Sequence, residues 1–170
     1  MAILAVERLS RAGFAPFGDV IAVEGSRHHT INDGHAERHH DLARVDVAAE
    51  GGRPLINIFR ATPWPLPLSV AMVERNPLSS QAFIPLAPAC FLLVVAAPGD
   101  APDPTALRAF VTDGSQGVNY ARGTWHHPVL ALDHLTDFLV VDRGGPGENC
   151  DVISFGDGSP TVDWPPATAR

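Results

Sequence analysis

Short apolar stretches alternate with proline- and glycine-rich breaks along most of this chain. Each stretch is short and rich in Val, Ile, Leu and Phe, a pattern typical of β-strands. We expect strands at residues 20–23, 45–48, 55–61, 68–73, 82–86, 90–96, 107–111, 129–132 and 136–142. Many short strands separated by turn signals predict a mainly β fold, either a sandwich or a barrel.

Helical periodicity is weak. Only residues 7–12, 102–107 and part of 37–44 are expected to form a helical turn or more. After Phe155 the composition shifts to proline and glycine, which favours extended or polyproline conformation. We predict one domain over residues 1–155, followed by a Pro-rich tail over 156–170 that stays largely unpacked.

Composition narrows the classes of partner. The chain has 45% hydrophobic and 18% charged residues, as soluble globular proteins do, and a net charge of −7 that argues against a nucleic-acid partner. No apolar run approaches the length of a membrane span. Cys90 and Cys150 lack C-x-x-C spacing, which fits a reducing compartment. We therefore expect a cytoplasmic protein with neither membrane nor nucleic-acid partners.

The histidine pair His126-His127, between Gly123 and Pro128, is the first candidate for chemistry. Histidine changes charge near neutral pH. Side chains alternate faces along a strand, so Tyr120 and His126 share one side while His127 lies on the other. Two readings remain open: one histidine faces the interior and is functional, or both are ordinary strand-end histidines bonded to backbone carbonyls.

Glu74 is the second candidate. Strand alternation places it on one face with Met72 and Asn76, ahead of the break at Pro77. Burial would raise the pKa of this carboxyl, and a nearby arginine or metal would lower it. The alternative is a surface pair between Glu74 and Arg75.

Arginines must attract any small anionic ligand, because the overall field of the protein is acidic. Arg60 ends an apolar strand, where it either reaches solvent or receives a carboxylate in a bidentate fork. Arg143 has the same two interpretations. Its simplest explanation is a local ion pair with Asp142. The five histidines between residues 28 and 40 match no zinc signature.

Several motifs carry a resemblance to a known family. The run Gly123-Thr124-Trp125-His126 resembles the second histidine motif of the cupin superfamily, and Glu74, Asn76 and Gln81 fall where its first motif lies. The surrounding segments 30–34, 37–43, 81–85, 107–110, 142–145 and 149–151 closely resemble the ureidoglycolate lyase family. The resemblance runs from about Phe14 to about Val152.

This resemblance implies a cupin-like β-barrel (double-stranded β-helix) with a few short helices, and a homodimer. It implies a cytoplasmic enzyme that cleaves ureidoglycolate to glyoxylate and urea in allantoin degradation. His126 is then the inward histidine, and His126 with Glu74 is the expected proton-transfer pair.

The same resemblance suggests the substrate contacts. A loop over the barrel opening would bring Asn32, Arg38 and His40 to the substrate, while Gln81 and Tyr120 would read its polar groups. We expect Arg60 to receive the carboxylate, with Arg143 or Arg38 as alternatives.

Metal-binding cupins commonly offer three histidines and a glutamate, whereas this chain has Glu74, Asn76, Gln81 and His126. Amides are weak ligands for transition metals. We expect no tightly bound cofactor and at most a weak divalent metal held by His126 and Glu74. Two other functions stay open: an amidohydrolase that releases ammonia from the ureido group, and a non-catalytic cupin that binds an organic acid.

Overall fold

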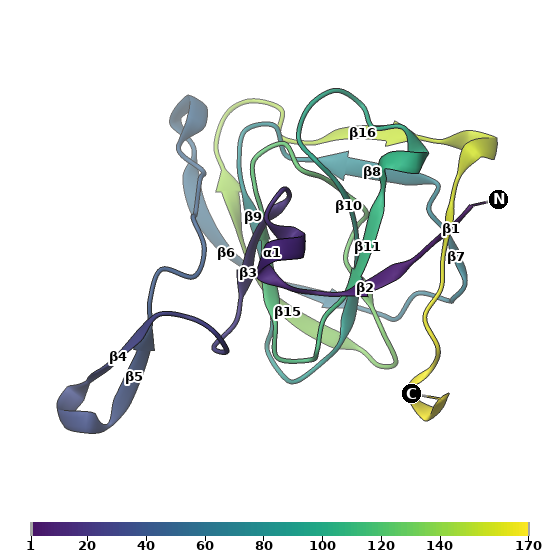
Figure 1. Ribbon diagram of the computed structural model, residues 1–170. Helices are drawn as coiled ribbons and strands as arrows, with labels where there is room; N and C mark the ends of the chain where they lie inside the picture. The colour runs from purple at the N-terminus through teal and green to yellow at the C-terminus, as the bar shows by residue number, and fades with distance from the viewer. Residues whose placement is uncertain (1, 170) are drawn as a thin grey trace.

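The computed structural model describes residues 2–169, and two β-sheets that face each other form its body (Figure 1). The first sheet contains β2 (Val6–Arg8), β8 (Met72–Arg75), β10 (Phe91–Ala96), β11 (Arg108–Val111), β13 (Trp125–His126), β14 (Leu130–Ala131) and β16 (Asp151–Ser154). The second contains, in spatial order, β3 (Gly18–Ile21), β12 (Gly117–Tyr120), β9 (Gln81–Pro85), β15 (Thr136–Gly144) and β6 (Arg53–Ala61).

Two smaller sheets complete the fold. One contains β1 (Ile3–Leu4), β17 (Thr161–Val162) and β7 (Leu68–Ser69), and the other pairs β4 (His28–Ile31) with β5 (Ala36–His39). The helical elements are α1 (Arg11–Phe14) and the 3₁₀ turns η1 (Asn32–Gly34), η2 (Ala49–Gly51), η3 (Pro104–Ala106), η4 (Gly156–Gly158) and η5 (Ala167–Ala169). The mainly β prediction is confirmed, and the strands described over residues 2–169 divide into four sheets.

Strand alternation separates two apolar cores. On β10, Phe91, Leu93 and Val95 point between the two large sheets. The intervening side chains, such as Val94, point to the opposite face of the first sheet, where Val162 of β17 also packs. A residue's parity on its strand therefore decides whether it faces the space between the two large sheets.

Several expected elements differ in the structure. Residues 45–48 form no strand; this segment runs as coil and is anchored by Ser80, whose backbone N–H donates to Asp46 O at 2.8 Å. The expected strand 68–73 is divided into β7 and β8. The turn expected at 102–107 is present as η3.

The expected helical segment 7–12 is instead the end of β2 followed by α1, which begins after Ser10. The side chain of Ser10 accepts a hydrogen bond from Gly13 N at 3.1 Å, the usual N-cap interaction. Residues 37–39, expected to be helical in part, belong to strand β5, because they pair with β4 in a hairpin that local propensity does not reveal.

This β4–β5 hairpin, residues 28–39, is an arm that projects from the body (Figure 1). Its strands pair only with each other, and β4 is exposed along its whole length. An isolated two-stranded hairpin is marginally stable in water. Unlike the strands of the two large sheets, the arm is therefore not stabilised by packing on a core.

The C-terminal tail packs on the body, contrary to the expectation of an unpacked end. β17 pairs with both β1 and β7, and Val162 is fully buried. Trp164 packs against the same core. The extended conformation expected from the composition is what allows this segment to join a sheet. No helix in residues 2–169 is long and apolar enough to span a membrane.

Candidate active site

His126 lies on β13, where it pairs in register with Val95 and with Glu74. It faces the space between the large sheets, as expected, and is 2% exposed. Its Nδ1 lies 3.0 Å from the carbonyl oxygen of Thr124. A carbonyl only accepts, so Nδ1 carries the proton and Nε2 carries a lone pair. Nε2 is buried and has no hydrogen-bond partner among the described residues.

Glu74, opposite His126 on β8, directs its carboxyl at that lone pair. Its Oε1 lies 3.7 Å from His126 Nε2, and its side chain is 30% exposed. Desolvation raises the pKa of Glu74 above its usual value, and burial lowers the pKa of His126 to about 4. Both shifts favour the neutral forms, so the pair resembles an acid facing a base more than a salt bridge.

Tyr120 belongs to the second large sheet and joins it to this pair. Its ring stacks on His126 with centroids 4.2 Å apart and planes inclined by 8°. Burial, and then the charge of Glu74, raises the pKa of Tyr120, so the phenol stays protonated. The expected single strand from Tyr120 to His126 is wrong: β12 ends at Tyr120, and a turn with Gly123 at φ 78° leads to β13 in the other sheet.

Three more polar side chains form a row with Tyr120 across the second sheet: those of Gln81, Asp142 and Asn57. Gln81 pairs in register with Tyr120. Its Nε2 lies 3.4 Å from Asp142 Oδ2, and Asn57 Nδ2 donates to Asp142 Oδ1 at 2.8 Å. We call Glu74, His126, Tyr120, Gln81, Asp142 and Asn57 the inner cluster.

Sequence reasoning did not identify Asp142 and Asn57. Asp142 has the same strand parity as the core residues Phe138 and Val140, and Asn57 has the parity of Phe59, which packs on Phe83. That parity was the available signal. The simple reading of Asp142 as an ion pair with its neighbour in sequence obscured it.

The structure places Arg60 and Arg143 outside the inner cluster. Arg60 lies on the outer face of β6 with Ile56 and Ile58, and it forms a bidentate salt bridge with Asp137 at 2.9 and 3.0 Å. Arg143 is buried on the side opposite Asp142, where it donates to the carbonyls of Ala49 and Pro146. These bonds hold both guanidinium groups on the side of the sheet that faces away from the inner cluster.

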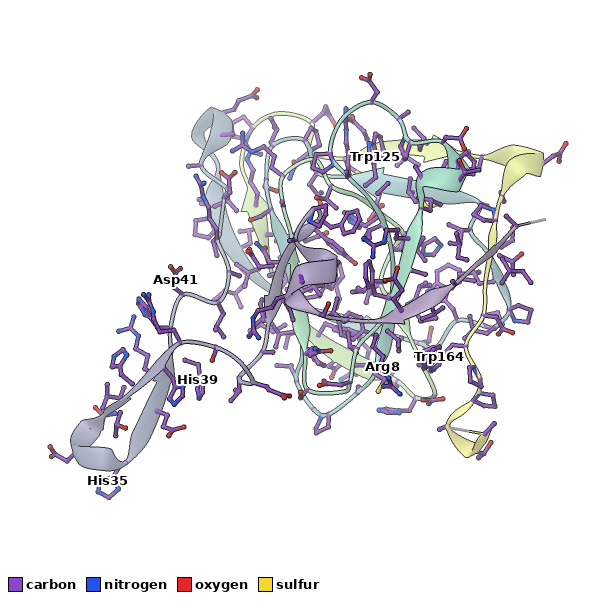
Figure 2. The ribbon with its side chains drawn as sticks, in the orientation of Figure 1. Arg8, His35, His39, Asp41, Trp125 and Trp164 are labelled. Carbon is purple, nitrogen blue, oxygen red and sulfur yellow. The ribbon has the colours of Figure 1, made fainter. Side chains whose placement is uncertain are left out.

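Two of the three residues expected in a covering loop, Asn32 and Arg38, lie on the arm instead, and His40 directly follows it. Figure 2 shows His35 at the outer end of the arm, far from Trp125, which precedes His126 in the body. Asn32 is in the turn of the arm and Arg38 is on β5. The arm therefore does not cover the inner cluster of its own chain, because its hairpin leads the backbone away from the body.

His127 and Asn76 have structural surroundings. The ring of His127 meets Trp64 edge-on, and its Nδ1 lies 2.9 Å from Pro128 O. Asn76 Nδ2 donates to Asn149 O at 2.8 Å. The Asn76 bond joins two segments that are 73 residues apart in the sequence, whereas the His127 bond is local to its own turn.

The side chains around His126 offer a poor metal site. In residues 2–169, no three His, Cys, Asp or Glu side chains are grouped so that they could hold a metal ion. His126 and Glu74 supply two donors, whereas catalytic zinc usually takes three protein ligands. The side-chain oxygens of Asn76 and Gln81 are neutral amide oxygens, which are weak ligands for transition metals. The residues present therefore do not fit a tightly held metal.

Comparison with known proteins places the chain in a family. The ureidoglycolate lyase family profile matches residues 1–162. A ureidoglycolate lyase from Burkholderia cepacia is 59% identical over 151 residues, which cover 89% of this chain and 85% of that protein. Another from Azotobacter vinelandii is 54% identical, covering 92% of this chain and 95% of that protein. The chain belongs to the ureidoglycolate lyase family.

A solved dTDP sugar isomerase from Desulfovibrio desulfuricans G20 is similar in structure at a TM-score of 0.45 and 15% identity. The likeness covers 84% of this chain and 88% of that chain. At this level of similarity it carries no conclusion about fold or function.

The neutral state of buried His126 predicts a pH-dependent contribution to stability. An unfolded histidine titrates near 6.5, and folded His126 near 4, so the unfolded state binds more protons between these values. The contribution of His126 is complete above pH 6.5 and falls by about 3 kcal/mol as the pH drops to 4. Glu74 acts in the opposite direction, because its pKa is raised in the fold.

Denaturant unfolding of wild-type protein and of His126→Gln, from pH 7 to pH 4, isolates this contribution, because Glu74 is present in both. We expect the stability difference between the two proteins to shrink toward acid pH. Parallel stability curves would show that His126 is not buried in the neutral state.

Proposed function

We propose that this protein is a cytoplasmic lyase that cleaves ureidoglycolate to glyoxylate and urea in the breakdown of allantoin. The observation that carries the proposal is the unpartnered lone pair of His126 Nε2 facing the Glu74 carboxyl at 3.7 Å. The ureidoglycolate lyase family profile and relatives at 54–59% identity support the substrate. The cytoplasmic assignment draws on the two cysteines, which are both free thiols.

The reaction needs two proton transfers. Ureidoglycolate carries a hydroxyl, a carboxylate and a ureido nitrogen on one carbon. Removal of the hydroxyl proton forms the C=O bond of glyoxylate, the carbon–nitrogen bond breaks, and a proton delivered to the nitrogen releases neutral urea. No water is consumed.

The two members of the pair suit these opposite roles. His126 accepts the hydroxyl proton at Nε2, because its Nδ1 proton is committed to the Thr124 carbonyl. Glu74, whose pKa is raised, donates a proton to the leaving nitrogen. Afterwards His126 holds one proton too many and Glu74 one too few. A proton transfer from Nε2 back to Oε1 restores both groups.

Tyr120 keeps the base in place for this cycle. Its ring covers one face of the His126 imidazole, which limits rotation of the base and excludes water from that side. Its raised pKa keeps the phenol in its neutral form, so the stack adds no charge beside Glu74.

Hydrolysis of the ureido group, with release of ammonia, has weaker support. That reaction calls for a strong nucleophile or a metal-activated water. Cys150 Sγ lies 4.0 Å from Glu74 Oε2, but desolvation and the carboxylates of Glu74 and Asp151 raise the pKa of this thiol. A protonated thiol is a weak nucleophile. A non-catalytic organic-acid binder would have no use for an unpartnered base.

The first prediction for this function concerns the products. The purified protein should convert ureidoglycolate to equal amounts of glyoxylate and urea, and His126→Ala should lower kcat about 10²-fold or more, since one general base typically contributes this much. Assays of urea, ammonia and glyoxylate in one reaction provide the measurement. His134→Ala, which alters an exposed histidine, serves as the control. Ammonia in place of urea would contradict the lyase.

We also propose that the enzyme works without a tightly bound metal, because one imidazole and one carboxylate form an incomplete ligand set. A weakly held divalent ion would share only His126 and Glu74. Elemental analysis of untreated protein should find well below one metal per chain, and activity should survive dialysis against a chelator. One equivalent of nickel, zinc or manganese, lost together with activity, would contradict this.

We further propose a homodimer in which the arm of one copy serves the other. The arm lacks packing within its own chain, and Ile56 and Ile58 are 77% and 62% exposed on the edge strand β6. The substrate carboxylate also needs a cation. Within residues 2–169 neither Glu74 nor Asp142 forms an ion pair with an arginine, and Arg38 of the arm has no carboxylate partner. An arm from a second copy would supply that charge.

Arg38→Ala tests this proposal against Arg60→Ala, a second exposed arginine on the outer face of β6. Sedimentation should show a dimer for the wild-type protein and for both variants. Loss of a charge-assisted bond should raise KM for ureidoglycolate about tenfold or more in Arg38→Ala and leave it unchanged in Arg60→Ala. A monomer, or an unchanged KM in Arg38→Ala, would contradict the role of the arm.

A further inference from the structure

Asp142 stands apart from the proton-transfer pair within the inner cluster. It lies on β15, and its carboxylate accepts from Asn57 on the neighbouring strand β6 and from Gln81 on the other neighbour, β9. Desolvation is the largest influence on its pKa, which is raised. A carboxylate facing the inside of the protein with only two amide donors is incompletely compensated.

The two amides fix the orientation of Asp142. A carboxylate only accepts hydrogen bonds, so Asn57 and Gln81 must present their N–H groups to it and turn their oxygens elsewhere. An ionised carboxylate offers about four acceptor positions, of which these amides use two. The cluster of one carboxylate and two amide oxygens is therefore rich in acceptors.

This set complements a ureido group. The ureido end of the substrate carries N–H donors on both nitrogens, and a carboxylate can receive two such bonds side by side. The substrate's own carboxylate has no donors and would be repelled by Asp142. Arg143 cannot relieve that repulsion, because it points to the opposite face and donates to Ala49 and Pro146.

The position of Asp142 fits this role. Tyr120, Gln81 and Asp142 lie on the adjacent strands β12, β9 and β15, so Asp142 is two strand spacings, roughly 10 Å, from the tyrosine that stacks on His126. A substrate whose reacting carbon lies at His126 and Glu74 extends its ureido end along this row.

We propose that Asp142, oriented by Asn57 and Gln81, is the subsite that recognises the terminal NH₂ of the ureido group. Asp142 orients the substrate so that the ureido end lies along the second sheet and the substrate carboxylate points away from Asp142. The inference rests on the proposed function for the identity of the substrate. Its test does not depend on turnover.

The test uses two ligands that cannot react because they lack the hydroxyl. N-carbamoylglycine ends in NH₂, and N-acetylglycine carries a methyl group in its place. Calorimetry should show that wild-type protein binds N-carbamoylglycine about 10- to 100-fold more tightly, since a site built for a donor rejects a ligand that lacks it. Asp142→Asn should lose most of this preference.

Asp137→Asn is the matched control, because Asp137 lies on the same strand with opposite parity and pairs with Arg60 outside the cluster. It should keep the full preference. Asn57→Ala, which leaves the carboxylate but removes one of the amides that orients it, should lose part of the preference and serves if Asp142→Asn fails to fold. Equal binding of the two ligands by wild-type protein, or an unchanged preference in Asp142→Asn and Asn57→Ala, would overturn the proposal.

Turnover of ureidoglycolate in the same preparations reports on the function separately. A protein that prefers N-carbamoylglycine yet does not cleave ureidoglycolate would support the subsite and contradict the lyase. A protein that cleaves ureidoglycolate without preferring N-carbamoylglycine would support the lyase and contradict the subsite.

Discussion

The hydrogen bond between His126 Nδ1 and the Thr124 carbonyl, 3.0 Å long and buried, determines what this site can do. It fixes the tautomer, so the lone pair of Nε2 faces Glu74. Burial opposes a charge on the imidazole and on the carboxyl alike: it lowers the pKa of His126 to about 4 and raises the pKa of Glu74 above its usual value. The same desolvation therefore favours the neutral, proton-bearing form of Glu74 and the neutral, proton-accepting form of His126.

The two-sheet architecture supplies the rest of the site. His126 and Glu74 come from one sheet, and Tyr120, Gln81 and Asp142 come from the other. The stacked rings of Tyr120 and His126 connect the sheets at the point where the chain crosses between them. Tyr120, Gln81 and Asp142 have the strand parity of core residues on the second sheet, so the packing that stabilises this sheet also orients these side chains.

Part of this arrangement could be predicted from the sequence. Apolar stretches with turn signals indicated the β class, and the resemblance to the two cupin motifs indicated the inward histidine and the glutamate opposite it. Parity also contained the information for Asp142, but a neighbouring arginine offered a simpler local explanation. Alternation keeps Asp142 and Arg143 on opposite faces, which rules that explanation out.

The remaining differences have a common physical origin, which is long-range pairing. Arg60 is held by Asp137, a residue 77 positions away, and the arm forms because two polar segments pair with each other. The tail joins a sheet because its strand β17 pairs with β1 on one side and with β7 on the other. The local sequence around a residue does not identify pairing partners that lie far away in the chain.

Nitrogen-15 NMR of histidine-labelled protein at pH 7 tests the central claim most directly, with the His126 signal assigned by its absence in His126→Gln. The account predicts a neutral imidazole protonated at Nδ1, with Nε2 unprotonated. An imidazolium, or a neutral ring protonated at Nε2, would contradict the assignment of His126 as the base.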